Sequence, residues 1–276
     1  MVGRLYIVPT PIGNLEDITL RALRVLNEVD LIAAEDTRHT RHLLNHFGIA
    51  TPLTSYHEHN EREKAAPLVE RIKNGTNIAL VSDAGTPAIA DPGFRLVAAA
   101  VAAGIEIVPL PGASALATVL SACGLPTDRF FFAGFLPAKK SERRARLGAL
   151  GEQTATLVFY DAPHRLRETL DDLQQSLGDR ELVVAREVSK VHEEFLRGKI
   201  SQIAAELAGR EVKGEITLVV HGATGEAKVS HELLKAEIRR LTDEGLGVKE
   251  IAELLGERFG VSKREVYRLT LDSRSR

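Results

Sequence analysis

The chain has 276 residues, 44% of them hydrophobic and 27% charged, which is typical of one large or two ordinary soluble domains. Its formal net charge of −2 excludes a polycationic protein, so any contact with nucleic acid has to rest on local basic patches. No apolar stretch reaches the length of a membrane span, and the first residues enter a strand pattern without a signal peptide. Cys123 is the only cysteine, so an internal disulfide is excluded, and we expect a cytoplasmic protein with a buried thiol.

Strand and helix signals alternate over the first 120 residues. Short apolar or β-branched runs predict strands at residues 5–8, 31–34, 52–55, 78–81 and 105–110. Segments of helical period lie between and after them, at residues 19–28, 40–47, 62–73, 94–103 and 114–122. This alternation predicts an α/β fold with a mostly parallel sheet and helices on both of its faces.

The loops that follow these strands hold most of the unusual residues. Right-handed crossovers bring such loops to one edge of the sheet, where open α/β proteins bind ligands. The most informative loop reads Ser82-Asp83-Ala84-Gly85-Thr86-Pro87-Ala88-Ile89-Ala90-Asp91-Pro92-Gly93. Its glycines let the backbone approach a ligand, and its prolines fix the shape of the loop. We therefore predict a binding site at this edge, although Asp91 could instead cap the helix that follows.

A second α/β unit follows a linker at residues 124–129. Its strands are predicted at residues 130–135, 156–160, 181–186, 193–197 and 216–220, with helices near 141–150, 164–177 and 203–207. The segment 193–201 lies too close to its neighbours for a helical crossover and is expected to run antiparallel. Phe130, Phe131 and Phe132 are predicted to be core residues instead of a platform for base stacking. The expected domains are 1–123, 124–224 and a helical module at 225–276, with a pocket between the first two.

The last part of the chain predicts three helices, at residues 231–242, 249–259 and 262–270. The short separator Gly260-Val261 and the N-cap Ser262 indicate a helix-turn-helix pattern. From Arg258 onward there are six basic and two acidic residues, a local excess that suits contact with phosphates. The alternative is a three-helix module with one solvated face.

Two common nucleotide-binding motifs are missing. No GxGxxG follows the first strand, and no GxxxxGK[ST] occurs in the chain. The first strand is followed instead by Pro9-Thr10-Pro11-Ile12-Gly13-Asn14. Dinucleotide-binding and P-loop interpretations therefore lose their main support.

An ordered set of segments resembles the tetrapyrrole methylase superfamily and, within it, the family of small-subunit ribosomal RNA methyltransferases I. The set covers residues 4 to about 222, at 6–14, 34–40, 55–61, 82–93, 111–114, 160–165, 186–194 and 214–219. The resemblance implies the two-domain fold of class III methyltransferases and S-adenosylmethionine as cofactor. It also implies 2′-O-methylation of a cytidine in the decoding region of 16S ribosomal RNA, within the 30S subunit, by a homodimer. The helix-turn-helix-like module is a weaker match.

The resemblance also implies which residues surround the cofactor. They are Pro11, Asp83, Ala84, Gly85, Thr86, Pro87, Ile89, Ser114, Ala115, Tyr160, Ala162 and Val188. In the superfamily the central loop reads Gly-Asp-Pro, whereas Gly85-Thr86-Pro87 stands here, so the acid is lost or replaced by Asp83. Because the cofactor is a sulfonium cation, Asp83 and Asp91 would lower the cost of its desolvation.

The general base that a ribose hydroxyl needs stays open. Candidates cluster in the segments 35–38 and 57–60, from which Asp36, Arg38, His57 and Glu58 are put forward as catalytic residues. Positioning of the ribose with loss of the proton to water is the alternative. No metal ion is expected, although His39, His42 and His46 lie at helical spacing, because this chemistry needs none and cysteine ligands are absent.

Basic residues that could contact RNA lie in three places. The candidates are Arg38, Arg41, Lys139, Lys140, Arg143, Arg144, Lys263 and Arg264. The segment 139–146 holds five basic residues and one acid, which suits a phosphate track or else a solvated helix face. Two other functions remain open: a methylase of a tetrapyrrole or protein side chain, and a non-catalytic nucleic-acid-binding protein that senses a metabolite.

Overall fold

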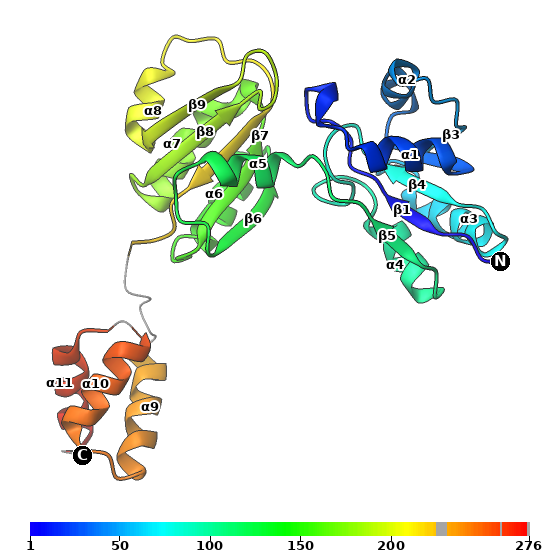
Figure 1. Cartoon of the computed structure of the whole chain (residues 1–276). Coiled ribbons are helices and arrows are strands. Elements are labelled where there is room, and N and C mark those ends of the chain that lie inside the picture. Colours follow the sequence, from blue (N-terminus) through cyan, green and yellow to red (C-terminus); the bar gives the residue numbers. More distant parts are fainter. Residues whose placement is uncertain (225–230, 260, 275–276) are drawn as a thin grey trace.

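The computed structural model describes residues 1–224, 231–259 and 261–274, which form two α/β lobes and a helical module (Figure 1). The first lobe has a parallel sheet of order β3-β2-β4-β1-β5. Its strands are β1 (Leu5–Ile7), β2 (Leu31–Ala34), β3 (Leu53–Ser55), β4 (Ile78–Val81) and β5 (Ile107–Pro109). The predicted parallel α/β lobe is confirmed.

Helices cover both faces of the first sheet. On one face lie α1 (Leu20–Glu28) and α2 (Thr37–His46), and on the other lie α3 (Glu61–Lys73) and α4 (Phe94–Ala102). The central strand β4 sends Leu80 into one core and Val81 into the other, which explains why its sequence is apolar throughout. Helix α2 begins three residues before the predicted start, because the Asp36 side chain accepts a hydrogen bond from the Arg38 N–H at 2.7 Å and caps it.

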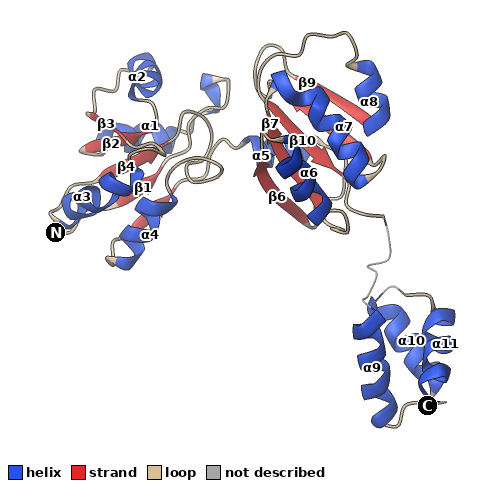
Figure 2. Ribbon diagram, turned by 180° about the vertical axis from the view of Figure 1, so that it is seen from behind, coloured by secondary structure: helices blue, strands red, loops and turns tan. Residues whose placement is uncertain are grey.

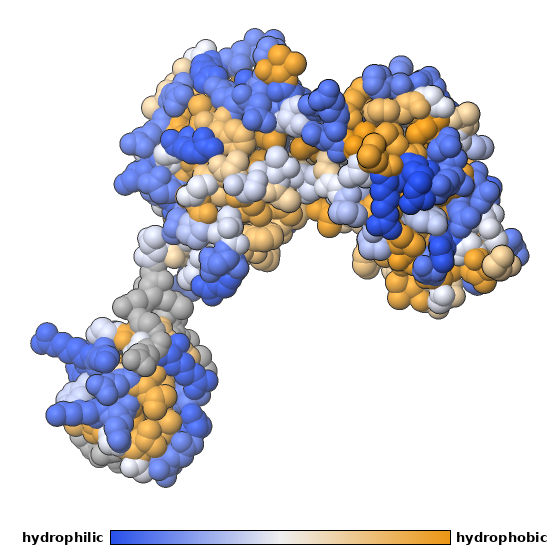
Figure 3. Space-filling view, in the orientation of Figure 1, coloured by the Kyte–Doolittle hydropathy of each residue, from blue (hydrophilic) through white to orange (hydrophobic). Residues whose placement is uncertain are grey.

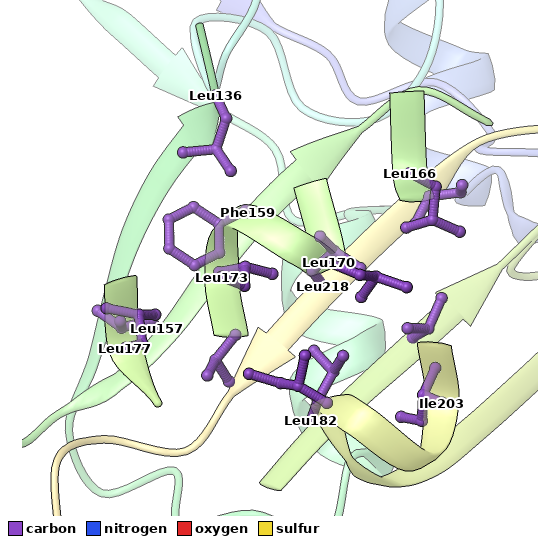
Figure 4. Close-up of a cluster of buried hydrophobic side chains, with 14 of the residues drawn as sticks. Leu136, Leu157, Phe159, Leu166, Leu170, Leu173, Leu177, Leu182, Ile203 and Leu218 are labelled. Atoms are coloured by element: carbon purple, nitrogen blue, oxygen red, sulfur yellow. The ribbon is translucent and has the colours of Figure 1, made fainter. Parts of the chain in front are cut away.

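The second lobe has a mixed sheet of order β6-β7-β10-β8-β9. Its strands are β6 (Phe130–Phe135), β7 (Thr156–Asp161), β8 (Glu181–Arg186), β9 (Glu194–Lys199) and β10 (Ile216–Val220). The pair β8–β9 is antiparallel, as predicted from its short connection. Helices α6 (Lys140–Ala149), α7 (Leu166–Leu177) and α8 (Ile200–Glu206) cover one face (Figure 2). Figure 4 shows Phe159 of β7 and Leu173 of α7 in the apolar cluster beneath them.

The prediction that all three phenylalanines at residues 130–132 are core residues is wrong for two of them. Phe130 and Phe131 are 47% and 43% exposed, because β6 is an edge strand of its sheet, whereas Phe132 is partly buried against an apolar cluster. Helix α5 (Ala115–Ala122) packs on the second sheet, with Val119 and Cys123 against Val158 and Val219. Helix α5, which lies before the expected boundary between residues 123 and 124, thus shares an apolar cluster with the second sheet. Cys123 is buried and free, as expected.

The helical module consists of α9 (His231–Asp243), α10 (Val248–Phe259) and α11 (Lys263–Arg274). Leu234, Ile238, Ile251, Leu255 and Val266 form its core. The Ser262 hydroxyl accepts a hydrogen bond from the Glu265 N–H at 3.1 Å, as the predicted N-cap requires. Gly260 and residues 225–230 lie outside the described residues. None of the described helices combines the length and apolar character needed to cross a membrane.

Candidate active site

The loops after β1 and β4 meet at the carboxyl edge of the first sheet. The chain leaves these adjacent strands toward opposite faces, to α1 and to α4, which opens a crevice between them. Thr10 and Gly85 join the two loops by a pair of backbone hydrogen bonds, each 2.9 Å long. The Thr86 hydroxyl donates to the carbonyl oxygen of Ala113 at 3.0 Å and so fixes the loop after β5 to the same place.

The loop 82–93 is held in a strained shape. Ala88 and Ala90 have φ angles of 67° and 65°, which cost about 1–2 kcal/mol per residue outside glycine. Both flank Ile89, which is exposed and faces the crevice. The N-cap of α4 is Gly93, without a side-chain hydrogen bond, so the alternative role of Asp91 as the cap is wrong. Strain of this kind persists where the surrounding structure enforces it, commonly at functional sites.

A cleft of about 360 Å³ lies between the two lobes at this edge. Figure 3 shows apolar surface on the part of the first lobe that faces the second. The first lobe contributes loop residues after β1, β2 and β4, and the second contributes the ends of β6, β7 and β10 and the start of α5. The lining residues are Ile12, Glu35, Asp83, Ala84, Gly85, Thr86, Ile89, Asp91, Ser114, Ala115, Phe135, Tyr160, Asp161, Ala162, Pro163, Gly214, Glu215, Ile216 and Thr217.

The charged residues of this cleft are all acidic. Five carboxylates line it, and within the described part of the chain no lysine, arginine or histidine does. Burial, reinforced by the carboxylates of Glu35 and Asp83, raises the pKa of Asp91 to about 6. Burial also raises the pKa of Glu35, whose carboxylate accepts a hydrogen bond from the Asp83 N–H at 3.4 Å. Asp161 and Glu215 pair with Arg165 and Lys190 outside the lining, so the charge of the cleft rests chiefly on Glu35, Asp83 and Asp91. The cleft therefore favours a small cation with an apolar body.

Nine of the twelve predicted cofactor residues lie together in the lining of this cleft: Asp83, Ala84, Gly85, Thr86, Ile89, Ser114, Ala115, Tyr160 and Ala162. The other three do not. Pro11 lines a neighbouring pocket, Pro87 is buried within its loop, and the Val188 side chain packs into the apolar core beside α5.

The four candidate catalytic residues lie outside the cleft lining. Asp36 caps α2 and pairs with Arg38, whose side chain is 89% exposed, at 3.2 Å. His57 lies 3.0 Å from the amide of Asn60, and Glu58 is exposed. Glu35 and Asp91 line the cleft instead. Glu35 belongs to the candidate segment 35–38 and directly follows the buried strand β2.

The basic candidates divide into exposed and structural residues. Lys139, Lys140, Lys263 and Arg264 are exposed, and Arg38 and Arg41 lie on the outer side of α2. Arg143 is completely buried, with its Nε donating to Asp172 Oδ2 at 2.8 Å, so its assignment as a phosphate contact is wrong. Arg144 also pairs with Asp172, at 2.6 Å, and is partly exposed. Part of the run 139–146 therefore stabilises the fold, because the guanidinium groups of Arg143 and Arg144 both pair with the buried Asp172 carboxylate.

Further lining residues escaped the sequence analysis, among them Ile12, Phe135, Asp161 and Pro163. Phe135 and Asp161 end β6 and β7, and the mixed strand order of the second sheet brings those ends together with the start of β10. Among the described residues no three histidine, cysteine, aspartate or glutamate side chains converge to hold a metal ion.

Comparison with known proteins identifies the family. Residues 4–204 match the family of tetrapyrrole (corrin/porphyrin) methylases. Ribosomal RNA small subunit methyltransferase I from Synechocystis sp. is 49% identical over 98% of both chains. The enzyme of that name from Bacillus subtilis is 46% identical, over 96% of this chain and 93% of its own.

Solved structures share the fold. Uroporphyrin-III-C-methyltransferase from Thermus thermophilus has a TM-score of 0.55 at 23% identity, covering 84% of this chain and 98% of its own. A diphthine synthase has a TM-score of 0.58 at 16% identity, over 79% and 90% of the two chains. The chain therefore belongs to the tetrapyrrole (corrin/porphyrin) methylase family and, within it, to the ribosomal RNA small subunit methyltransferases I.

Proposed function

We propose that this methyltransferase transfers a methyl group from S-adenosylmethionine to the 2′-hydroxyl of a cytidine in the decoding region of 16S ribosomal RNA. The observation that carries the cofactor assignment is the cleft between the lobes, where every charged lining residue is an acid. The names of full-length relatives at 46–49% identity support the acceptor. A related fold, the uroporphyrin-III C-methyltransferase of Thermus thermophilus, is described in complex with S-adenosyl homocysteine.

The residues of the cleft fit this cofactor. Asp83, Asp91 and Glu35 offset the positive charge of a sulfonium, and apolar side chains such as Ile12 and Ile89 cover its uncharged parts. On the second lobe Tyr160 and Ala162 would surround the adenine. When bound, S-adenosylmethionine supplies an electrophilic methyl group. Because methyl transfer needs an in-line approach, the fixed loops contribute chiefly by alignment.

Glu35 and Asp91 are the groups best suited to take the proton of the ribose hydroxyl. Both line the cleft, and burial raises the pKa of each, which brings a carboxylate closer to the range that general bases need near neutral pH. Asp36, Arg38, His57 and Glu58 lie outside the lining, and Arg38 suits the phosphates of the acceptor instead.

The charge of Asp91 is expected to make cofactor binding depend on pH. Because its pKa is raised to about 6, the carboxylate becomes neutral below pH 6, where an exposed aspartate is still charged. Affinity for S-adenosylmethionine should then fall roughly tenfold between pH 7.5 and 5. S-adenosylhomocysteine lacks only the methyl group and its charge, so its affinity should change much less. Calorimetric titration of both ligands at several pH values measures the difference.

Asp91→Asn is the matched variant for this titration. It should flatten most of the pH dependence for S-adenosylmethionine, leaving the contribution of Glu35, whose pKa burial also raises. Parallel losses for the two ligands in the wild type would contradict the electrostatic explanation.

The exposed and partly exposed basic residues are proposed to bind the RNA backbone. They are Arg38, Arg41, Lys139, Lys140, Arg144, Lys263 and Arg264. An acid-lined cleft repels phosphates, so the RNA backbone has to run along its rim while only an uncharged part of the acceptor enters.

The acceptor is proposed to be the assembled 30S subunit, and the reaction is proposed to take place in the cytoplasm. The enzyme is proposed to act as a homodimer, in which a second copy would cover the exposed Phe94 and Val101 of α4.

Transfer of a radiolabelled methyl group tests the activity directly. We expect label on the ribose of one cytidine when 30S subunits from cells lacking this protein are used, and much less on free 16S RNA or on uroporphyrinogen. Label on the tetrapyrrole alone would support the other acceptor class. Cofactor binding without label on any acceptor would support a metabolite-sensing protein and overturn the proposal.

A further inference from the structure

A second pocket lies beside the cleft, on the first lobe. Its volume is about 240 Å³, and it is lined by Thr10, Pro11, Leu15, His39, His42, Leu43, His46 and Asp83. Asp83 lines both hollows, so the pocket is the immediate neighbour of the site proposed for methyl transfer. The pocket is smaller than the range of roughly 300–1,000 Å³ that drug-sized ligands occupy, so it suits a group such as one heterocyclic ring.

Three imidazoles form the helical wall of this pocket. His39, His42 and His46 lie three and four residues apart on α2, which puts them on one face of the helix. The fold turns that face toward the loop after β1. Within residues 1–224, 231–259 and 261–274 none of these imidazoles has a hydrogen-bond partner, and they do not form a metal site. The ring of His46 makes a T-shaped contact with Phe47, with 4.7 Å between the ring centroids. The imidazole faces beside Pro11 and Leu15 offer a surface on which another flat ring can stack.

The neighbouring side of α2 carries positive charge. Arg38 and Arg41 line a shallow hollow with Thr37, His42, Asn45 and Leu53, and His42 belongs to both hollows. A chain of phosphates held by these arginines would pass directly beside the histidine-lined pocket. The acids of the cleft keep the same phosphates out of the site of methyl transfer.

We infer that this pocket receives an unstacked nucleobase of the acceptor RNA, with its ribose directed into the adjoining cleft; the inference rests on the proposed function. A ribose hydroxyl in a stacked strand cannot reach an enclosed cleft unless its nucleotide swings out, and the exposed base then needs a partner. The imidazoles supply the stacking surface. The Asp83 carboxylate supplies a hydrogen-bond acceptor at the shared wall, which suits the exocyclic amine of cytosine.

Proton NMR of the histidine rings of the full chain tests this pocket without any enzymatic turnover. The signals of His39, His42 and His46 are assigned from the three single His→Ala variants. Cytidine 5′-monophosphate is expected to shift all three signals, whereas ribose 5-phosphate, which has no base, leaves His39 and His46 in place and shifts at most His42, which also lines the hollow of the two arginines. Equal shifts with the two probes would show that only the phosphate binds, and this result would overturn the inference, as would no shift with either.

Kinetics on 30S subunits give a second readout. The double variant His39→Ala/His42→Ala removes two stacking surfaces, and since stacking on one base contributes about 1–3 kcal/mol, KM for the subunit should rise about tenfold. Its kcat and its affinity for S-adenosylmethionine should stay unchanged. His59→Ala/His192→Ala is the matched control, because it removes two exposed imidazoles that line neither hollow.

The outcomes separate the inference from the proposed function. If the wild type labels 30S subunits and the two double variants have the same KM, the pocket does not hold a base and only the inference fails. If the wild type labels no RNA, the proposed function fails and the inference fails with it.

Discussion

Gly85→Arg is expected to abolish binding of S-adenosylmethionine. Gly85 lies in the wall of the cleft, and a Cβ there would meet Ile12 Cγ2 at 3.5 Å and the carbonyl oxygen of Ala113 at 3.8 Å. The first carbon therefore fits, but a long side chain has to extend through the space that the ligand needs. Its guanidinium would neutralise the acids of the cleft and repel a sulfonium. We expect at least a hundredfold loss of affinity by calorimetry.

Two control variants separate occupation of the cleft from backbone strain. The φ angle of Gly85 is +79°, so any other residue there costs about 1–2 kcal/mol of strain. Gly85→Ala carries this strain without filling the cleft and should retain most of the affinity. Gly124→Arg places the same side chain at a φ of +77° in the exposed linker, where no atom lies within 4 Å of the added Cβ. Unchanged affinity in Gly85→Arg would contradict the position assigned to the cofactor.

Arg143→Met is expected to destabilise the protein strongly. Arg143 and Asp172 both have completely buried side chains, and their Nε–Oδ2 distance is 2.8 Å. Arg143 also donates to the carbonyl oxygen of Ala138 at 3.0 Å. Burial by itself would raise the pKa of Asp172, but hydrogen bonds from Arg144 and Arg143 outweigh it and hold the pKa below its ordinary value. Removing one partner leaves a buried charge partly uncompensated, which costs about 3–5 kcal/mol.

Urea unfolding at neutral pH measures this loss. Lys140→Met is the matched control, because Lys140 is exposed at the first position of the same helix and should change the free energy of unfolding by less than about 0.5 kcal/mol. Arg144→Met should lie between the two, since Arg144 is 40% exposed but shares Asp172. If Arg143→Met were as stable as the wild type but bound RNA less tightly, the structural role of Arg143 would be contradicted. That result would support the original prediction that Arg143 contacts RNA phosphates.

The order of elements and the position of the site could be predicted from the sequence. Strands β2 and β4 were predicted residue for residue, because a parallel strand buried on both faces has a continuous apolar run. The loop 82–93 was predicted as part of a ligand site, because its glycines allow close approach of the backbone, its prolines fix its shape, and both are visible in the sequence. Nine of the twelve residues carried over from the family resemblance line the cleft, and Asp91, singled out for its charge, lines it too.

Only the tertiary structure decided which partner each side chain contacts. A run of basic residues such as 139–146 has the same sequence whether its side chains face water or a carboxylate 29 residues away. The packing of α6 on α7 decided that Arg143 is buried. The edge position of β6 exposes Phe130, and the fold packs α5 on the second sheet. The sequence by itself determined the local elements and the residues held in their loops, since these depend on neighbours along the chain. The burial of Glu35 and the pocket of three histidines depend on segments far apart in the sequence, so only the folded chain determines them.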